Sequence, residues 1–270
     1  MRAWRSPAAL FGGTVVGLAV LVALGAPFLA TTDPVTQNLR ALLAAPSPTH
    51  WFGTDELGRD TYSRIVFGAR TSLGVGLSAT AIALCFGLTI GLIAGWFGGW
   101  ADVVAMRAVD GLLAFPALVL ALAITATLGP NVQDAIVAIG VTGIPAFARL
   151  ARGQVLAVKN LDFVQSARAL GASDARILGR HVLPNIAAPL IVQTSLAIPA
   201  AIIAEAALGF LGLGVQPPTP SWGAMINAGK GYLEADPILV LAPGAAIFLT
   251  VLAFNFLGDA VRDALDPRMR

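Results

Sequence analysis

The chain has 270 residues, of which 57% are hydrophobic and only 12% are charged, against roughly 25% charged in soluble proteins. So few charges cannot cover a surface that faces water, so the composition excludes a soluble globule and predicts a protein of the lipid bilayer. The 17 basic and 15 acidic residues leave a net charge of +2 and form no basic stripe, so we expect no nucleic-acid partner. The single cysteine, Cys85, excludes an internal disulfide and is expected to pack as a small apolar side chain.

Six charge-free stretches are candidates to cross a bilayer, whose core of roughly 30 Å needs about 20 helical residues. They are Ala8–Leu29, Thr71–Phe97, Gly111–Leu128, Ala135–Ala148, Ile186–Ala204 and Pro237–Leu257. The first follows two arginines as a signal peptide would, but it is longer than the roughly 7 to 15 apolar residues of a secretory segment, so we expect a retained helix. The sequence therefore predicts an all-α polytopic membrane protein with six transmembrane helices.

A seventh charge-free stretch, Ala206–Gly229, has Pro217, Pro218 and Pro220 in its middle. These prolines remove backbone donors that lipid cannot replace. We therefore expect a re-entrant or surface segment there rather than a span.

The second predicted span carries Gly87, Gly91 and Gly95 at four-residue spacing. Small residues let helix backbones approach closely in lipid, so this stripe is predicted to be a packing surface. Ionisable residues are sparse in the spans, whereas an ion-coupled carrier would more often place such groups near the midplane. We therefore expect the energy for any pumping to come from another protein.

Six spans place both termini on one side, and basic residues indicate which side that is. With the N-terminus in the cytoplasm, twelve of the seventeen basic residues lie inside. The other five, Arg40, Arg59, Arg64, Arg70 and Lys230, lie outside. Both termini are therefore predicted to be cytoplasmic.

The longest inward segment, Arg149–Asn185, carries six basic residues and is predicted to form two short helices joined by a tight turn. Phe163, Ala167 and Leu170 would share one face of the first helix. Gly171 would take the left-handed position that ends this helix, and Ser173 would cap the next. A solvated basic loop is the alternative, but the small and apolar face favours a docking ridge for a cytoplasmic partner.

This segment resembles the EAA loop of binding-protein-dependent ABC importer permeases. The family pattern is Glu-Ala-Ala, three residues, Gly, nine residues, Ile, one residue, Leu-Pro. Here it is matched in spacing by Gln165, Ser166, Ala167, Gly171, His181, Leu183 and Pro184. Glu is replaced by Gln165, the first Ala by Ser166, and Ile by His181. Three further stretches, His50–Leu77, Glu205–Gly223 and Leu257–Arg268, resemble the second, shorter subunit of the dipeptide, oligopeptide and nickel permeases.

The resemblance implies an ABC importer permease (MetI-like) fold with cytoplasmic coupling helices. Residues 1–70 would form the first helix and an outer loop, 71–270 the permease core, and 153–185 the EAA-like loop. The implied function is import of dipeptides or oligopeptides across the bacterial cytoplasmic membrane. Nickel or another small ligand is the alternative cargo, and an ion-coupled secondary transporter is the alternative class.

The resemblance also implies the partners: a homologous second permease subunit forming a heterodimer, two ATP-binding subunits, and an extracytoplasmic substrate-binding protein. The ATP-binding subunits, which would bind ATP and Mg²⁺, would dock on Phe163, Gln165, Ser166, Ala167, Leu170, Gly171, His181, Leu183 and Pro184. The chain itself has no phosphate-binding motif, since Gly223–Lys230 has the wrong spacing and is followed by Gly231 instead of Ser or Thr. We therefore predict no catalytic residue, no cofactor and no metal site in this chain.

On the outer side, contacts with the binding protein or a gate are expected from Asp55, Arg59, Asp60, Glu205, Pro218, Trp222 and Gly223. The acidic and basic residues between positions 55 and 64 could also suggest a catalytic carboxylate pair or a cation site. Local ion pairing that orders the outer loop is favoured over both. Trp51 and Trp222 are expected to be interfacial anchors.

Overall fold

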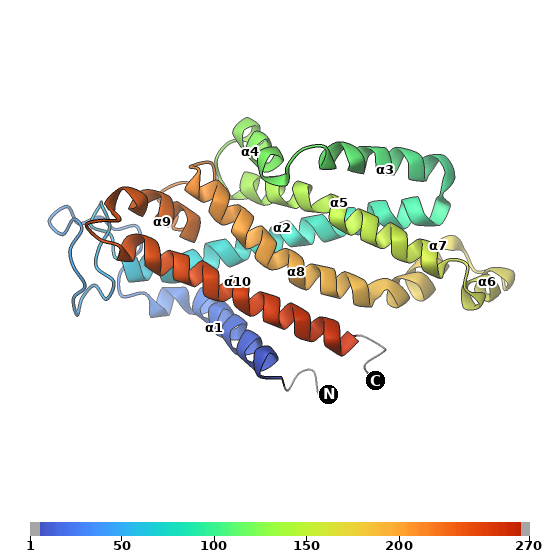
Figure 1. Cartoon of the computed structure of the whole chain (residues 1–270), viewed down its shortest axis with the longest axis horizontal. Helices are drawn as coiled ribbons and strands as arrows, with labels where there is room; N and C mark the ends of the chain where they lie inside the picture. Colours follow the sequence, from blue (N-terminus) through green and yellow to red (C-terminus); the bar gives the residue numbers. More distant parts are fainter. Residues whose placement is uncertain (1–5, 266–270) are drawn as a thin grey trace.

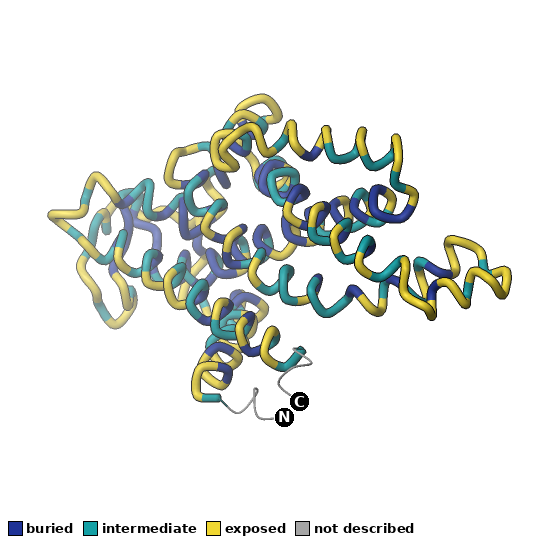
Figure 2. Tube along the Cα trace, turned by 45° about the vertical axis from the view of Figure 1, so that its right-hand side comes forward, coloured by how far each residue is buried: buried dark blue, intermediate teal, exposed yellow. Residues whose placement is uncertain are grey.

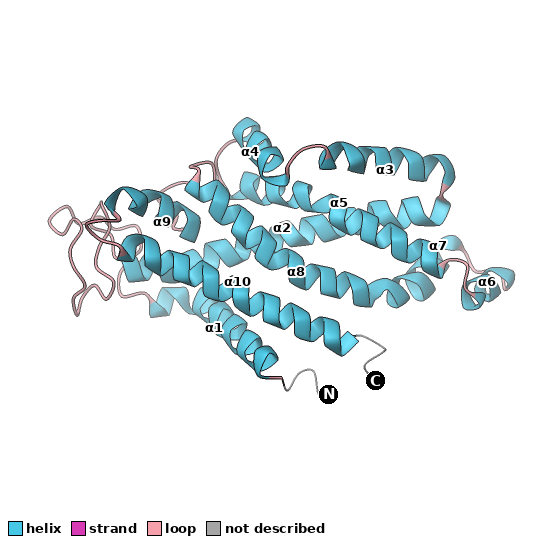
Figure 3. Ribbon diagram, viewed as in Figure 1, coloured by secondary structure: helices cyan, strands magenta, loops and turns pink. Residues whose placement is uncertain are grey.

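The computed structural model describes residues 6–265, and over this range the chain forms helices and loops without a strand (Figure 3). The helices are α1 (Pro7–Leu29), α2 (Thr61–Phe97), α3 (Gly99–Leu113), α4 (Ala117–Leu128), α5 (Val132–Val158), α6 (Asp162–Ala169), α7 (Asp174–Ile177), α8 (Leu183–Phe210), α9 (Trp222–Gly229) and α10 (Ile238–Leu265). A π-helical turn, Leu178–Val182, joins α7 to α8, and a 3₁₀ turn, Lys230–Tyr232, follows α9. The predicted all-α class is confirmed.

The long helices α1, α2, α5, α8 and α10 run roughly along one axis and form an elongated bundle (Figure 1). One end, which we call the α9 end, carries residues 30–60, α9 and the start of α10. The opposite end, which we call the α6 end, carries α6 and α7. The start of α1 and the end of α10 both point toward the α6 end, as an even number of passages requires.

Five helical stretches are long and apolar enough to cross a membrane: α1, α2, α5, α10 and the continuous stretch that contains α7 and α8. Helices α3 and α4 meet this test only as a pair, and they are bent by 89° relative to each other. In Figure 1 the pair carries the chain from the end of α2 to the start of α5. The described residues therefore contain five candidate spans, or the predicted six if the bent pair counts as one.

The predicted third span, Gly111–Leu128, is wrong as a single helix. Helix α3 ends at Leu113, and α4 begins only at Ala117. Pro116 accounts for the break, because its ring removes an amide donor and disfavours the helical conformation at Phe115.

Helices α2 and α5 extend past the predicted spans, because α2 begins at Thr61 and α5 continues to Val158. The prediction counted only charge-free residues and so stopped at the first arginine, whereas the structure gives ion-pair partners to Arg64 of α2 and to Arg149 and Arg152 of α5. Arg152 of α5 forms a two-point ion pair with Asp102 of α3, with N–O distances of 2.5 and 2.6 Å. The charged part of α5 is therefore covered by α3.

The glycine stripe of α2 is confirmed as a packing surface against α5. A β-carbon at Gly91 would lie 2.5 Å from the carbonyl oxygen of Ala148 and 2.6 Å from the β-carbon of Ala151. The two backbones are therefore in direct contact, as small residues allow in membrane helices. Figure 2 shows that burial is concentrated in this central part of the bundle, whereas the α6–α7 segment is largely exposed.

The seventh charge-free stretch, Ala206–Gly229, does not form a span, as predicted. Helix α8 continues to Phe210, and after a proline-containing loop the short α9 packs against α8 and α10. Gly223 permits this packing, because a β-carbon there would lie 2.5 Å from the carbonyl oxygen of Ala206.

Candidate functional site

The α6–α7 segment is a helical hairpin whose turn has the Schellman hydrogen-bond pattern. Gly171 has a φ of +80°. Its N–H donates to the carbonyl of Arg168 at 2.9 Å, and the N–H of Ala172 donates to the carbonyl of Ala167 at 3.1 Å. The predicted left-handed turn at Gly171 is confirmed. Ser173 stands at the N-cap position of α7, but its side chain makes no capping hydrogen bond, so that detail of the prediction is wrong.

Helix α6 has one anchored face and one free face. Val164 is fully buried in a cluster that includes Ile177 of α7 and Ile186 of α8. On the free face the Leu170 side chain is 88% exposed and Phe163 is 40% exposed. Exposed apolar side chains on a helix that is itself anchored form a surface suited to a protein partner.

The remaining residues predicted for this loop lie around the same hairpin. Ala167 is half-buried against the cluster, whereas Gln165, Ser166, Gly171 and Pro184 are exposed and His181 and Leu183 are half-buried. The side-chain amide of Gln165 donates to the carbonyl of Lys159, the residue that ends α5, at 3.2 Å. The structure therefore brings all the predicted docking residues to one end of the bundle.

Arg168 joins α6 to the last turn of α2. Its guanidinium carbon lies 5.1 Å from the centroid of the Trp96 ring, within the range of a cation–π contact. Trp96 is 7% exposed and belongs to the same buried cluster as Val164. Lys159 reaches the same turn, because its ammonium group donates to the carbonyl of Gly95 at 2.9 Å. The hairpin is therefore joined to α2 as well as to α7 and α8.

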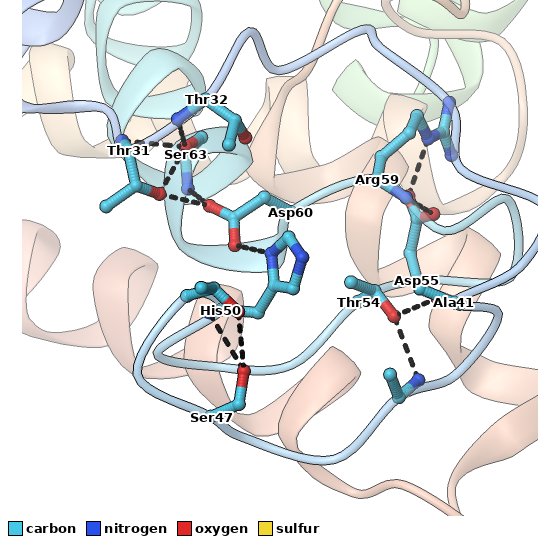
Figure 4. A network of polar contacts seen from close by, with 12 residues as sticks. Thr31, Thr32, Ala41, Ser47, His50, Thr54, Asp55, Arg59, Asp60 and Ser63 are labelled. Carbon is cyan, nitrogen blue, oxygen red and sulfur yellow. Dashed lines mark hydrogen bonds and ion pairs between the residues drawn. The ribbon is translucent and has the colours of Figure 1, made fainter.

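At the α9 end, Asp60 is the centre of a buried polar network (Figure 4). Its carboxylate accepts hydrogen bonds from the N–H of Ser63 at 2.8 Å and the hydroxyl of Thr31 at 2.9 Å, and it lies 2.9 Å from Nδ1 of His50. Burial raises the pKa of the Asp60 carboxyl, but the hydrogen bonds from Ser63, His50 and Thr31 more than offset this, so its pKa is lowered below 3.8. The network ties the loop after α1 to the start of α2.

Replacing Asp60 with Ala should lower the free energy of unfolding by about 2 to 3 kcal/mol, because the buried N–H of Ser63 and the hydroxyl of Thr31 lose their acceptor. Asp60→Asn keeps one carbonyl oxygen as an acceptor and should lower the free energy of unfolding by a smaller amount. Since the pKa of Asp60 is lower in the folded state, its stabilisation is present above the unfolded value and is lost as the pH falls through the folded value. Thermal unfolding of the purified protein between about pH 7 and pH 3 measures this, and an equal loss of stability with pH in wild type and Asp60→Asn would contradict it.

Beside this network, buried ion pairs order the loop between α1 and α2. Arg59 lies 2.6 Å from the Asp55 carboxylate and 2.9 Å from that of Glu56, and Arg64 lies 3.3 Å from Asp55. Each carboxylate therefore faces an arginine, which is the ion pairing that the sequence favoured over a catalytic carboxylate pair. Between residues 6 and 265, no cluster of His, Cys, Asp or Glu is arranged to hold a metal ion.

A second buried polar group joins α2, α8 and α9. The Glu205 carboxylate accepts a hydrogen bond from the Ser72 hydroxyl at 2.9 Å, and Ser72 accepts one from the backbone N–H of Trp222 at 3.3 Å. Trp222 is 2% exposed, and its indole N–H donates to the carbonyl of Ile65 at 3.0 Å. The prediction that Trp222 anchors the chain at the membrane interface is therefore wrong. Gly68 leaves the space for its ring, since a β-carbon there would lie 2.9 Å from the indole.

Most of the residues predicted for outer contacts are buried within this chain. They are Asp55, Arg59, Asp60, Glu205, Trp222 and Gly223, whereas Pro218 is exposed. The surface of the α9 end includes Trp51, 54% exposed, whose ring lies 4.7 Å from that of Tyr62. The buried residues therefore shape this end, and other side chains form its outer surface.

Three structurally important residues were not identified from the sequence: Val164, Trp96 and Ser72. Ser72 carried a weak signal as a polar residue within an apolar helix, but Glu205 lies 133 positions away in the sequence, so only the structure brings the two together. Val164 and Trp96 are apolar residues in apolar surroundings, so nothing in the sequence distinguishes them from other packing residues.

Comparison with known proteins finds relatives over nearly the whole chain. Residues 87–270 match the family model described as "Binding-protein-dependent transport system inner membrane component", and residues 2–46 match the "N-terminal TM domain of oligopeptide transport permease C". The chain is 46% identical to a dipeptide transport system permease protein DppC of Alkalihalophilus pseudofirmus, over 98% of this chain and 88% of that protein. It is 44% identical to a glutathione transport system permease protein GsiD of Pectobacterium atrosepticum, over 100% of this chain and 90% of that protein.

Solved structures support the same fold. An inward-facing structure of the MetNI methionine ABC transporter aligns with a TM-score of 0.60 at 18% identity, covering 75% of this chain and 96% of that chain. An amino acid ABC transporter with histidines aligns with a TM-score of 0.59 at 16% identity, covering 75% and 94%. The family models, the dipeptide and glutathione relatives and the shared fold together show that this chain belongs to the binding-protein-dependent inner membrane components, as an ABC importer permease of the dipeptide and glutathione transport group.

Proposed function

We propose that this chain is the membrane-spanning subunit of an importer that carries short peptides across the bacterial cytoplasmic membrane, driven by ATP hydrolysis in partner subunits. The observation that carries the proposal is the α6 hairpin, which is anchored through Val164 and presents Leu170 outward. The relatives support the cargo, because one is named for dipeptides and the other for glutathione, a tripeptide.

We assign different partners to the two ends of the bundle. An ATP-binding subunit, holding ATP and Mg²⁺, docks on the α6 hairpin, and a second one docks on a homologous permease that completes a heterodimer. An extracytoplasmic binding protein delivers the peptide at the α9 end. The described part of this chain offers no phosphate loop in the segment with the closest spacing, because Gly223–Lys230 forms α9 and the start of the following 3₁₀ turn.

The distribution of charge supports a cytoplasmic α6 end with both termini on that side. The hairpin carries Arg168, Arg176 and Arg180 close together. At the α9 end, by contrast, Arg59 and Arg64 are buried and neutralised by acidic partners. The four arginines at the chain termini that also entered the sequence prediction, at positions 2, 5, 268 and 270, lie outside the described residues.

The structure suggests how movement of the hairpin reaches the spans. Closure of the two ATP-binding subunits displaces α6, and α6 is joined to α2 through Arg168 and Trp96. Helix α2 is in turn in backbone contact with α5 along the glycine stripe. A displacement at the docking surface therefore moves α2 and α5 together, and the bundle opens toward the binding protein until hydrolysis resets it.

Replacing Arg168 with Met should lower the number of peptides imported per ATP hydrolysed by about two- to fivefold, the size expected for loss of one cation–π contact. Binding of the ATPase subunits should persist, since Leu170 and Phe163 are unchanged. Arg168→Lys keeps the cation and should cost less. Arg176→Met removes a charge from the exposed part of α7 on the same hairpin and is the matched control. Equal effects of Arg168→Met and Arg176→Met in reconstituted vesicles would contradict the link to Trp96.

Replacing Gln165 with Glu, the residue usual in the family pattern, should leave ATP-driven uptake within about twofold of wild type. The hydrogen bond from Gln165 to Lys159 is exposed and long at 3.2 Å, so its loss costs little. Uptake assays of the two proteins side by side measure this, and a severe loss in Gln165→Glu would show that the amide itself is required for coupling.

The cargo is tested most directly with the reconstituted complex and its own binding protein. Dipeptides, longer peptides, glutathione, nickel and haem are each loaded on the binding protein, and stimulation of ATP hydrolysis is measured. We expect dipeptides or glutathione to stimulate hydrolysis. Stimulation by nickel or haem alone would overturn the peptide assignment and leave the permease assignment intact.

A further inference from the structure

A half-open cavity of about 260 Å³ is lined by residues of α2, α4, α5 and α8. Its walls are made largely of small residues, including Ala79 and Ala83 of α2, Gly143 of α5, and Ala197 and Ala201 of α8. Short side chains at these positions leave an open space where larger ones would fill the contact between the helices.

The cavity contains few polar groups, and two of them have unused hydrogen-bonding capacity. Thr80 is 4% exposed, and its hydroxyl has no hydrogen-bond partner among the described residues. Gln193 lines the cavity from α8, and no partner is found for its side-chain amide within residues 6–265, although the hydroxyls of its neighbours Thr194 and Ser195 donate to α8 carbonyls. The third polar residue, Thr142, already donates to the carbonyl of Ile139 at 2.8 Å.

Among the residues that the structure describes, no ionisable side chain lines this cavity. It therefore offers no ion pair to a terminal ammonium, a terminal carboxylate or a charged side chain. What it offers is a carboxamide, with donors and an acceptor, and a hydroxyl, in otherwise apolar surroundings. A ligand part that is neutral and carries both an N–H and a C=O group complements these groups, and the peptide group is such a part.

We propose that this cavity holds a backbone peptide group of the cargo during transport, with the Gln193 amide paired to its N–H and C=O and the Thr80 hydroxyl as a second contact. The inference rests on the proposed import of peptides and adds the site within the permease that recognises them. Such a site binds the backbone peptide group that all peptides share and makes no specific contact with their side chains or terminal charges. Selection among peptides is then left to the binding protein.

A lipid chain or a helix of the partner permease could also fill an apolar space of this kind. Either occupant with purely apolar side chains would cover the Gln193 amide and the Thr80 hydroxyl without offering them partners, which is unfavourable for polar groups cut off from water. A peptide group satisfies both, and this difference favours the cargo as the occupant.

The test uses the assembled complex in vesicles, with a binding protein saturated with dialanine or glutathione, whichever the wild type imports. Gln193→Leu keeps the size of the side chain and removes its hydrogen bonds. We expect it to lower the number of peptides imported per ATP hydrolysed by about tenfold, with ATP hydrolysis within about twofold of wild type. The matched control is Gln133→Leu, the same change at an exposed position near the start of α5, which should leave the ratio unchanged.

A labelling experiment identifies the occupant. In a Cys85→Ser background, which removes the lone cysteine, Ala197→Cys, a lining position on α8 that leaves Gln193 in place, is treated with a water-soluble maleimide during turnover. We expect labelling that slows at least about fivefold when the saturating cargo is present. Labelling that the cargo does not slow, or no labelling under any condition because the partner permease covers residue 197, would overturn the proposal.

The two inferences fail in different ways. If the wild-type complex imports neither dialanine nor glutathione, the proposed peptide import fails and the site falls with it. If the wild type imports one of them and Gln193→Leu retains the wild-type ratio of peptides to ATP, only the site is overturned.

Discussion

Replacing Gly171 with Trp is expected to abolish ATP-driven uptake while the chain still inserts and folds in the membrane. Gly171 has a φ of +80°, and a side chain in this left-handed region costs roughly 1 to 2 kcal/mol. A β-carbon there would meet no atom within 4 Å, so the bundle itself is not disturbed. The indole would instead stand next to the exposed Leu170 and block the docking face. Copurification of the ATP-binding subunits and uptake by reconstituted vesicles measure the effect.

The matched control is Gly171→Asn, because asparagine tolerates the left-handed conformation better than other side chains and adds little bulk. It should retain most of the uptake. Normal ATP-driven uptake by Gly171→Trp would mean that the partner docks elsewhere on the chain.

Replacing Gly91 with Leu should prevent stable folding, with a loss of about 3 kcal/mol or more in the free energy of unfolding. The new side chain would begin 2.5 Å from the backbone oxygen of Ala148, so α2 and α5 would have to separate. Gly74→Leu is the matched control in the same helix, because a β-carbon at Gly74 meets nothing within 4 Å. The yield of folded protein and its thermal unfolding in detergent measure both variants, and similar results for the two would show that the close contact of α2 with α5 is dispensable.

The sequence predicted those features that depend on local pattern. The helical class and most of the spans follow from apolar length, and the turn at Gly171 follows from a glycine placed directly after an amphipathic helix. The packing role of Gly87, Gly91 and Gly95 follows from their spacing on one helix face. These signals lie within single segments, so they can be read without knowing what packs against them.

The features that were missed depend on contacts between segments distant in sequence. The length of α5 follows from its pairing with α3 through Arg152 and Asp102, and the two residues are far apart in the chain. The burial of Trp222 requires a gap at Gly68 on another helix. Pro116 lies within the predicted third span, but a sequence pattern does not say whether a proline bends a span or divides it at 89°.

The candidate site also contains some features that local sequence predicts and others that depend on contacts between distant segments. The residues predicted for docking lie together around the α6–α7 hairpin and the start of α8 because the EAA-like spacing is local, and their docking role stays a prediction. The anchor of that hairpin, Val164, and its link to α2, Trp96, were not identified, because their importance comes from the cluster they share. At the α9 end most of the predicted residues are buried and contribute to packing and internal polar contacts. They therefore do not form an outer surface.

The central claim is that this chain works as the permease of an ATP-driven importer, and the energy source of uptake tests it most directly. The purified complex is reconstituted in vesicles with ATP on the side of the α6 hairpin and loaded binding protein on the other. Peptide uptake should require hydrolysable ATP and should continue when the proton gradient is removed. Uptake that persists without ATP and collapses with the proton gradient would contradict the account.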